Sequence, residues 1–170
     1  MTGLAVTGAD GQAARRPLRP TDVKRLNRSW RRLTRARLAL LLDSVGQPFN
    51  VGSILRTAAA LGVEQVWLCG DSASPDHPSA RKTALGTGRL VSWEQVQSAA
   101  DGAVPLHEAP LDGDVCLALG NEDRGCSAGL LAAADAVAYI PQAGRVGSLN
   151  VAAAAAIVLA EARRREWSRA

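Results

Sequence analysis

The chain has 170 residues, of which 47% are hydrophobic and 21% charged, with a formal net charge of +4. This length suits one domain with a substantial core, and the composition excludes a wholly disordered chain. Its cysteines, Cys69, Cys116 and Cys126, form neither a C-x-x-C pair nor an even set, so we expect no disulfide framework. No apolar run reaches the roughly 18 residues of a membrane span, and none precedes a signal-peptide cleavage site. We therefore expect a cytoplasmic protein with no membrane partner.

The amino-terminal residues 1–37 form a basic arm. They contain ten of the 20 Lys and Arg residues and only two carboxylates. Residues 20–22 read as a helix start, and apolar residues at three- and four-residue spacing predict an amphipathic helix to about residue 36. Such an arm attracts a phosphate backbone, although a solubilising surface is an equally good interpretation. The helix is also suited to packing on the domain or capping a dimer.

From residue 38 onward, short apolar strands alternate with helical stretches. Residues 38–42, ending at Asp43, predict a buried parallel strand. Residues 51–61 predict a helix closed by Gly62, residues 66–69 a second strand, and residues 70–80 a loop. The weaker strand candidates are residues 90–93 and 103–106, with a short helix between them.

The carboxyl-terminal half continues this alternation. Residues 115–119 predict a buried strand, 130–134 a helix, 136–140 a strand stopped by Pro141, and 148–165 a long Ala-rich helix. The pattern predicts an α/β fold with a mainly parallel sheet and helices on both faces. Ligands of open parallel sheets bind beyond the carboxyl ends of the strands, so a site is expected in the loops there.

Three of those loops carry unusual residues. In the first, residues 50–58 read N-V-G-S-I-L-R-T-A, with Asn50 where a helix N-cap is wanted and Gly52 permitting close backbone approach. Arg56 stands in an otherwise apolar run, and such an arginine most often snorkels or forms a salt bridge. The second loop, G-N-E-D-R-G at 120–125, is also typical of a polar turn. The third, I-P-Q-A-G-R-V-G-S-L-N-V at 140–151, offers Ser148 as an N-cap.

Together the loops resemble, in order, the three motifs of the TrmH (SpoU) family of the SPOUT superfamily. These are roughly N-x-G-x-x-x-R-x-A, G-x-E-x-x-G and I-P-x-x-G-x-x-x-S-L-N-V. The resemblance runs from about residue 38 to 165. Gln142 and Ala152 stand where Met and Ser are common, and neither has a proposed catalytic role. The matching residues are Asn50, Gly52, Arg56, Ala58, Gly120, Glu122, Gly125, Ile140, Pro141, Gly144, Ser148, Leu149, Asn150 and Val151.

The resemblance implies an S-adenosylmethionine-dependent RNA methyltransferase acting on a ribose 2'-hydroxyl, with tRNA the first substrate candidate and rRNA a close second. It implies a Rossmann-like parallel SPOUT fold with a deep carboxyl-terminal trefoil knot in residues 38–170, and a homodimer. S-adenosylmethionine is the methyl donor, and no metal is needed. By resemblance, the donor is bound by Leu119, Gly120, Asn121, Gly125, Ile140, Pro141, Ser148 and Leu149.

The same resemblance makes Arg56 the catalytic residue. We prefer a fixed cation that orients the target phosphate and stabilises the developing alkoxide, because an arginine is very hard to deprotonate; a general-base role stays open. Asn50, Glu122, Ser148 and Asn150 then position this arginine and the ribose by hydrogen bonds.

Three alternatives remain: a base methyltransferase of the same superfamily, an RNA-binding module without turnover, and an unrelated nucleotide-binding α/β protein. The third is disfavoured because no Walker loop is present and residues 86–88 are too short for a dinucleotide fingerprint. His77 and His107 lack metal-ligand spacing. Besides the basic arm, residues 163–165 are a second candidate for RNA contact, and a role in antibiotic resistance stays open.

Overall fold

The computed structural model describes the chain except for residues 1–19, 88–91, 97–102, 122 and 144–148. The chain forms two compact units, Met1–Leu33 and Thr34–Ala170. The described part of the first unit is helix α1 (Pro20–Leu33), whose Leu26, Trp30 and Leu33 side chains are exposed. The predicted amphipathic helix is confirmed, and it ends three residues earlier than expected.

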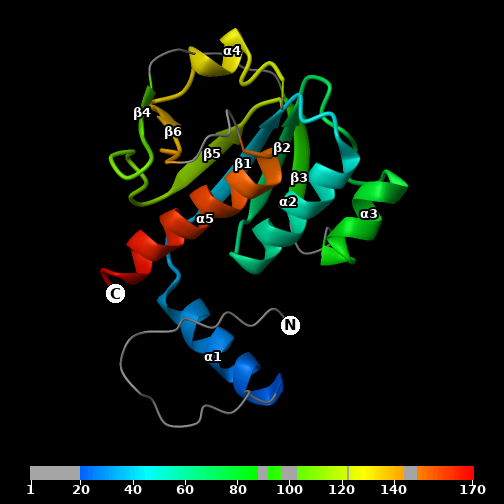
Figure 1. The fold of residues 1–170 in the computed structure, drawn as a ribbon. Coiled ribbons are helices and arrows are strands. Elements are labelled where there is room, and N and C mark those ends of the chain that lie inside the picture. The colour runs from blue at the N-terminus through cyan, green and yellow to red at the C-terminus, as the bar shows by residue number, and fades with distance from the viewer. Residues whose placement is uncertain (1–19, 88–91, 97–102, 122, 144–148) are drawn as a thin grey trace. The chain divides into compact units, whose positions relative to one another are not determined.

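The second unit is built on a four-stranded parallel sheet (Figure 1). Its strand order is β3-β2-β1-β5, so the strand with the longest apolar run lies inside the sheet. A second sheet pairs two short parallel strands, β4 (Ala103–Pro105) and β6 (Val137–Tyr139). The predicted parallel α/β fold is confirmed. The strands of the larger sheet are β1 (Leu38–Asp43), β2 (Gln65–Cys69), β3 (Ser92–Val96) and β5 (Val115–Leu119).

Helices α2 (Pro48–Ala60) and α5 (Val151–Trp167) lie side by side over one face of this sheet (Figure 1). Side chains alternate along a strand, so Leu38, Leu40 and Leu42 of β1 all point to this face, where they are buried in the core beneath the two helices. On the opposite face, Trp67 is half-buried and Cys116 is exposed. Among the described residues, helices therefore cover one face rather than the predicted two.

Two short helices differ from the sequence prediction. Helix α3 (Pro78–Ala84) begins inside the predicted loop 70–80. Its start is stabilised by Pro78 in the first turn and by His77, whose Nδ1 accepts a hydrogen bond from the Ser79 N–H at 3.2 Å. Helix α4 (Ala128–Leu131) lies earlier than the predicted 130–134. No helix in the described ranges is both long and apolar enough to cross a membrane.

Arg163 joins α5 to the ends of neighbouring elements. Its side chain is 3% exposed and pairs with Glu166 at 2.7 Å. The guanidinium also donates to the carbonyl oxygens of Leu61, Gly62 and Ala36, each at 2.8 Å. Two of these carbonyls follow the carboxyl end of α2, where helical backbone lacks partners of its own. Arg163 is therefore a structural residue.

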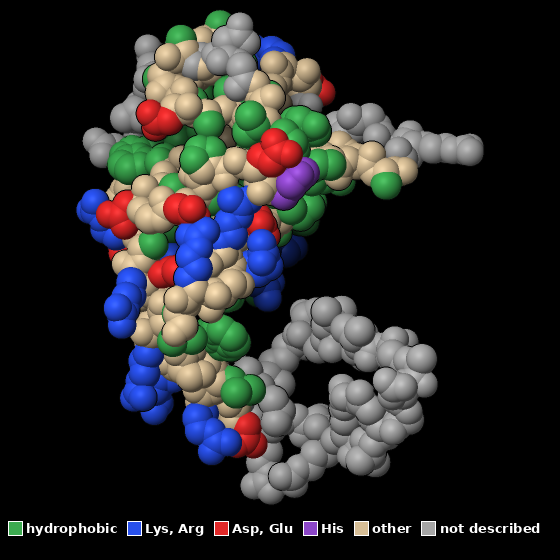
Figure 2. Space-filling view, turned by 90° about the vertical axis from the view of Figure 1, so that its left-hand side faces the viewer, with side chains coloured by type: hydrophobic (Ala, Val, Ile, Leu, Met, Phe, Trp, Pro, Cys, Tyr) green, Lys and Arg blue, Asp and Glu red, His purple; other side chains and the backbone are tan. Residues whose placement is uncertain are grey.

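The two following arginines are also engaged within the fold. Arg164 and Arg165 both bind Glu161, and their hydrogen bonds lower the pKa of that carboxyl to about 2. Arg165 donates further to the carbonyls of Ala109 and Leu106. Figure 2, which faces this side, shows basic side chains lying among acidic ones. All three arginines of residues 163–165 are thus paired within the fold, and their contact with RNA stays a prediction.

Candidate active site

An open pocket of about 610 Å³ lies where the loop after β1 meets the loop after β5 and the start of α5. This is the carboxyl edge of the parallel sheet, where ligands of such folds bind. Each of the three loops singled out from the sequence contributes to it, and its volume suits a nucleotide-sized ligand. The lining residues are Gly46, Gln47, Phe49, Asn50, Asn121, Asp123 and Asn150.

An amide pair joins the first and third loops. The Nδ2 of Asn150 donates to the Oδ1 of Asn50 at 3.1 Å, while the Oδ1 of Asn150 accepts from the Ala152 N–H at 2.9 Å. Asn150 is thus the N-cap of α5, and the helix begins at Val151 rather than at 148. Ser148, predicted as this cap, lies outside the described residues.

The role expected for Asn50 also differs. Gln47 holds the N-cap position of α2, followed by Pro48, so Asn50 lies inside the first turn. There its side chain is buried and faces Asn150 rather than capping the helix. The physical reason is the proline, which starts a helix readily because it needs no partner for an N–H.

We expect Asn150→Ala to lower the free energy of unfolding by about 1–2 kcal/mol, since it removes both a helix cap and a hydrogen bond. Asn150→Asp keeps the capping oxygen but loses the donor to Asn50. The loss of unfolding free energy caused by Asn150→Asp should therefore disappear when Asn50 is already replaced by alanine. Urea unfolding in a double-mutant cycle measures this. If the changes in unfolding free energy of the two single variants simply add in the double variant, the two loops are not directly linked.

Asn121 holds the second loop. Its Nδ2 donates to the Ser44 carbonyl at 2.7 Å, and its Oδ1 accepts from the N–H groups of Asp123 and Arg124, both at 3.0 Å. Its backbone pairs in both directions with Gly125, at 2.9 and 3.0 Å. Asn121 therefore fixes this loop against the end of β1.

The two glycines of the second loop are required by its shape. A Cβ on Gly120 would lie 2.3 Å from the Cys126 nitrogen, and Gly125 has φ +70°. The spacing G-x-x-x-x-G is thus explained by backbone folding back on itself. Gly52 has a comparable role, because a Cβ there would lie 2.3 Å from the Ala80 carbonyl oxygen of α3.

Asp43, predicted only as the end of a strand, links two of the loops. It is buried and accepts a hydrogen bond from the Ser127 N–H at 2.6 Å. Partial burial, and then the Asp43 carboxylate, raise the pKa of the Cys126 thiol, and partial burial of its sulfur raises the pKa of Cys116 to about 11 although the residue is exposed overall. Both thiols are therefore protonated and poorly nucleophilic at neutral pH. No described cluster of three His, Cys, Asp or Glu residues could hold a metal ion.

Arg56 does not line this pocket. It is exposed on α2, six residues beyond Asn50, and forms no hydrogen bond or ion pair with any described residue. The salt bridge that was the plainer interpretation of Arg56 is therefore not found among the described residues. Glu122 lies outside the described residues, as Ser148 does.

The residues expected to bind the methyl donor are only partly brought together. Asn121 lines the pocket, and Leu119 and Gly120 precede it at the end of β5. Leu149 is exposed, directly before the N-cap residue of α5. Ile140, which packs against the core, and Pro141 follow β6 and do not line the pocket.

Phe49 is a feature of the site that was not predicted from the sequence. It is the single phenylalanine of the chain, lines the pocket, and is 63% exposed. Its position directly before Asn50 was the available signal. An apolar residue in the first turn of a helix is more often a core residue, however, and sequence alone does not reveal its exposure.

The model of the SpoU rRNA Methylase family matches residues 37–103 and 95–160. An uncharacterised tRNA/rRNA methyltransferase from Synechocystis sp. is 36% identical, over 78% of this chain and 55% of that protein. The 23S rRNA (guanosine-2'-O-)-methyltransferase RlmB of Acinetobacter baylyi is 33% identical, over 74% of this chain and 58% of that protein.

Among solved structures, the AdoMet-bound rRNA methyltransferase from Sinorhizobium meliloti superposes with a TM-score of 0.70 at 30% identity. The match covers 78% of this chain and 57% of that one. The chain thus spans a little over half the length of the curated relatives it matches.

Proposed function

The chain belongs to the SpoU rRNA methylase family, and on that premise we propose that it transfers a methyl group from S-adenosylmethionine to a ribose 2'-hydroxyl of RNA. The main support is the pocket in which all three motif loops converge, with Asn50, Asn121 and Asn150 in its lining. The relatives include an uncharacterised tRNA/rRNA methyltransferase and a 23S rRNA methyltransferase, so either RNA is a candidate substrate.

The pocket suits the methyl donor chemically. Amides in its lining match the hydrogen-bonding groups of an adenosine and an amino acid, and the Asp123 carboxylate is favourable beside a sulfonium. Of the residues proposed to hold the donor, Asn121 lines this pocket. The others, from the motif loops and the end of β5, are Leu119, Gly120, Gly125, Ile140, Pro141, Ser148 and Leu149. When bound, S-adenosylmethionine supplies an electrophilic methyl group, so the protein needs no nucleophile of its own.

The protein's task is then to position the ribose and to stabilise the negative charge that develops on its 2'-oxygen. We assign the second role to Arg56, whose fixed cation has no competing carboxylate among the described residues. Asn50 and Asn150 orient the ribose by hydrogen bonds, and we assign the same positioning role to Glu122 and Ser148.

Because Arg56 lies outside the pocket of its own subunit, we propose that a homodimer completes the site. An exposed stripe on α5 supports this: Ala153, Ile157 and Ala160 recur at three- and four-residue spacing. Small side chains there allow a second helix to approach closely. A trefoil knot in the carboxyl-terminal segment and a cytoplasmic location complete the proposal.

The test is methyl transfer from isotopically labelled S-adenosylmethionine to separated tRNA and rRNA fractions transcribed without modifications. We expect a labelled 2'-O-methylnucleoside from one fraction after digestion and mass spectrometry. Label on a base would identify the chain as a base methyltransferase. Donor binding without transfer to either fraction would contradict action on free RNA, and the absence of donor binding would contradict the enzyme itself.

A further inference from the structure

The basic side chains of the second unit divide into two groups. Salt bridges engage one group, which consists of Arg37, Arg124, Arg163, Arg164, Arg165 and Arg169. Within the described ranges of residues 34–170, four basic side chains have no acidic partner: Arg35, Arg56, Arg81 and Lys82. Three of these four are exposed on the neighbouring helices α2 and α3.

Helices α2 and α3 form a continuous surface. They touch at Gly52, where the α2 backbone approaches the Ala80 carbonyl of α3 too closely for any larger residue. Phe49 and Arg56 lie three residues before and four residues after Gly52, so all three share one side of α2. The exposed side chains of Phe49 and Arg56 therefore lie together on one side of the line along which α3 packs.

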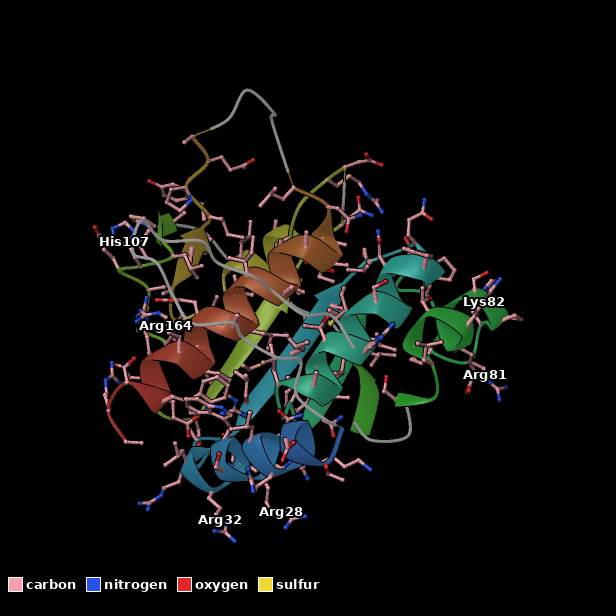
Figure 3. All side chains as sticks on the ribbon, turned by 60° about the horizontal axis from the view of Figure 1, so that its bottom comes forward. Arg28, Arg32, Arg81, Lys82, His107 and Arg164 are labelled. Carbon is pink, nitrogen blue, oxygen red and sulfur yellow. The ribbon has the colours of Figure 1, made fainter. Side chains whose placement is uncertain are left out.

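Arg81 and Lys82 extend this surface on α3. Figure 3 shows both side chains projecting from α3, away from the α5 side of the unit where Arg164 lies. Both are exposed, and no described carboxylate pairs with either of them. Cations that the protein leaves unpaired are available to bind phosphate groups of a partner.

Phe49 supplies a contact of another kind at the pocket end of this surface. An exposed phenyl ring beside a polar pocket is a platform on which an unpaired base can stack, a common feature of proteins that bind single-stranded RNA. The surface thus offers cations for phosphates along α3 and an aromatic ring for a base at the pocket.

We propose that the exposed edge formed by α2 and α3 is the RNA-binding surface, with Arg81 and Lys82 holding backbone phosphates and Phe49 stacking on a base at or beside the target nucleotide. This deepens the proposed function and rests on it. It places RNA contacts of the second unit on these helices and not on residues 163–165.

The test measures dissociation constants of the full chain for the separated tRNA and rRNA fractions, at several salt concentrations. For the double variant Arg81→Gln/Lys82→Gln we expect weaker binding and a salt slope reduced by about 1 for each lost phosphate contact. For Phe49→Ala we expect binding weakened about tenfold with an unchanged salt slope, and Phe49→Trp should restore it.

The matched control is Arg164→Gln/Arg169→Gln, which removes the same charge from two exposed side chains that are paired within the fold. Equal weakening in the control would assign the effect to net charge and overturn the proposal. Unchanged binding by Arg81→Gln/Lys82→Gln would overturn it too, while methyl transfer by the wild type would leave the proposed function standing. If the wild type binds RNA through this surface but transfers no methyl group, the proposed function fails and the surface stands.

Discussion

Arg56→Ala is expected to reduce methyl transfer by a factor of about 100 or more, which is the usual cost of removing one donor that stabilises a developing oxyanion. The same change should alter the free energy of unfolding by less than about 0.5 kcal/mol, because Arg56 is exposed and has no described partner. Single-turnover rates with saturating RNA and donor, beside urea unfolding curves, measure both quantities. Wild-type rates in this variant would remove Arg56 from the catalytic site.

Arg56→Lys separates charge from geometry. A lysine keeps the positive charge but loses the planar fork that can hold two oxygens at once. If the guanidinium both orients a phosphate and stabilises the alkoxide, the lysine variant should be closer to alanine than to wild type. Near-normal turnover would show that a point charge is sufficient.

Mixed dimers test where Arg56 acts. Gly120→Ala places a Cβ against the Cys126 backbone and should disable the donor pocket. If each site combines the pocket of one subunit with Arg56 of its partner, equal mixtures of Arg56→Ala and Gly120→Ala chains form some dimers with one intact site. Such mixtures should recover about a quarter of wild-type activity after subunit exchange. No recovery would place Arg56 and the pocket in one subunit.

The main strands could be predicted because their signal is local. The apolar runs of β1, β2 and β5 are typical of buried parallel strands, and the structure has them at or within one residue of the predicted bounds. Helix α3 was missed because its start depends on His77 acting as a cap, which is uncommon for histidine. The start of α5 was misplaced because Ser148 and Asn150 are both good caps, and contact with Asn50 favours the second.

The pocket could be predicted in outline, since three loops at strand ends must meet at one edge of a parallel sheet. The different roles of neighbouring side chains could not be predicted from the sequence. Residues 163–165 are three identical arginines, and their different environments depend on carbonyls more than 50 residues away in the chain. Likewise, the exposure of Phe49 depends on how the tertiary packing leaves the first turn of α2 uncovered.

Arg163→Met should lower the free energy of unfolding by about 3 kcal/mol or more. Methionine fills a similar volume but donates no hydrogen bonds, so the carbonyls of Leu61, Gly62 and Ala36 all lose a partner in a buried setting. Glu166 is less affected, because the backbone N–H groups of Arg35 and Ala36 still bind it. Urea unfolding of the full chain measures the loss.

The control for this change is the next residue along the chain. Arg164 is 63% exposed, against 3% for Arg163, and Glu161 keeps Arg165 when Arg164 is replaced. Arg164→Met should therefore cost less than about 0.5 kcal/mol. Comparable costs for both variants would show that the carbonyl contacts of Arg163 contribute little. Arg163 and Asn150 lie near opposite ends of α5. Methyl transfer by folded Arg163→Met protein at low temperature should therefore stay close to that of the wild type. This result would separate the role of α5 in stability from its role in the site.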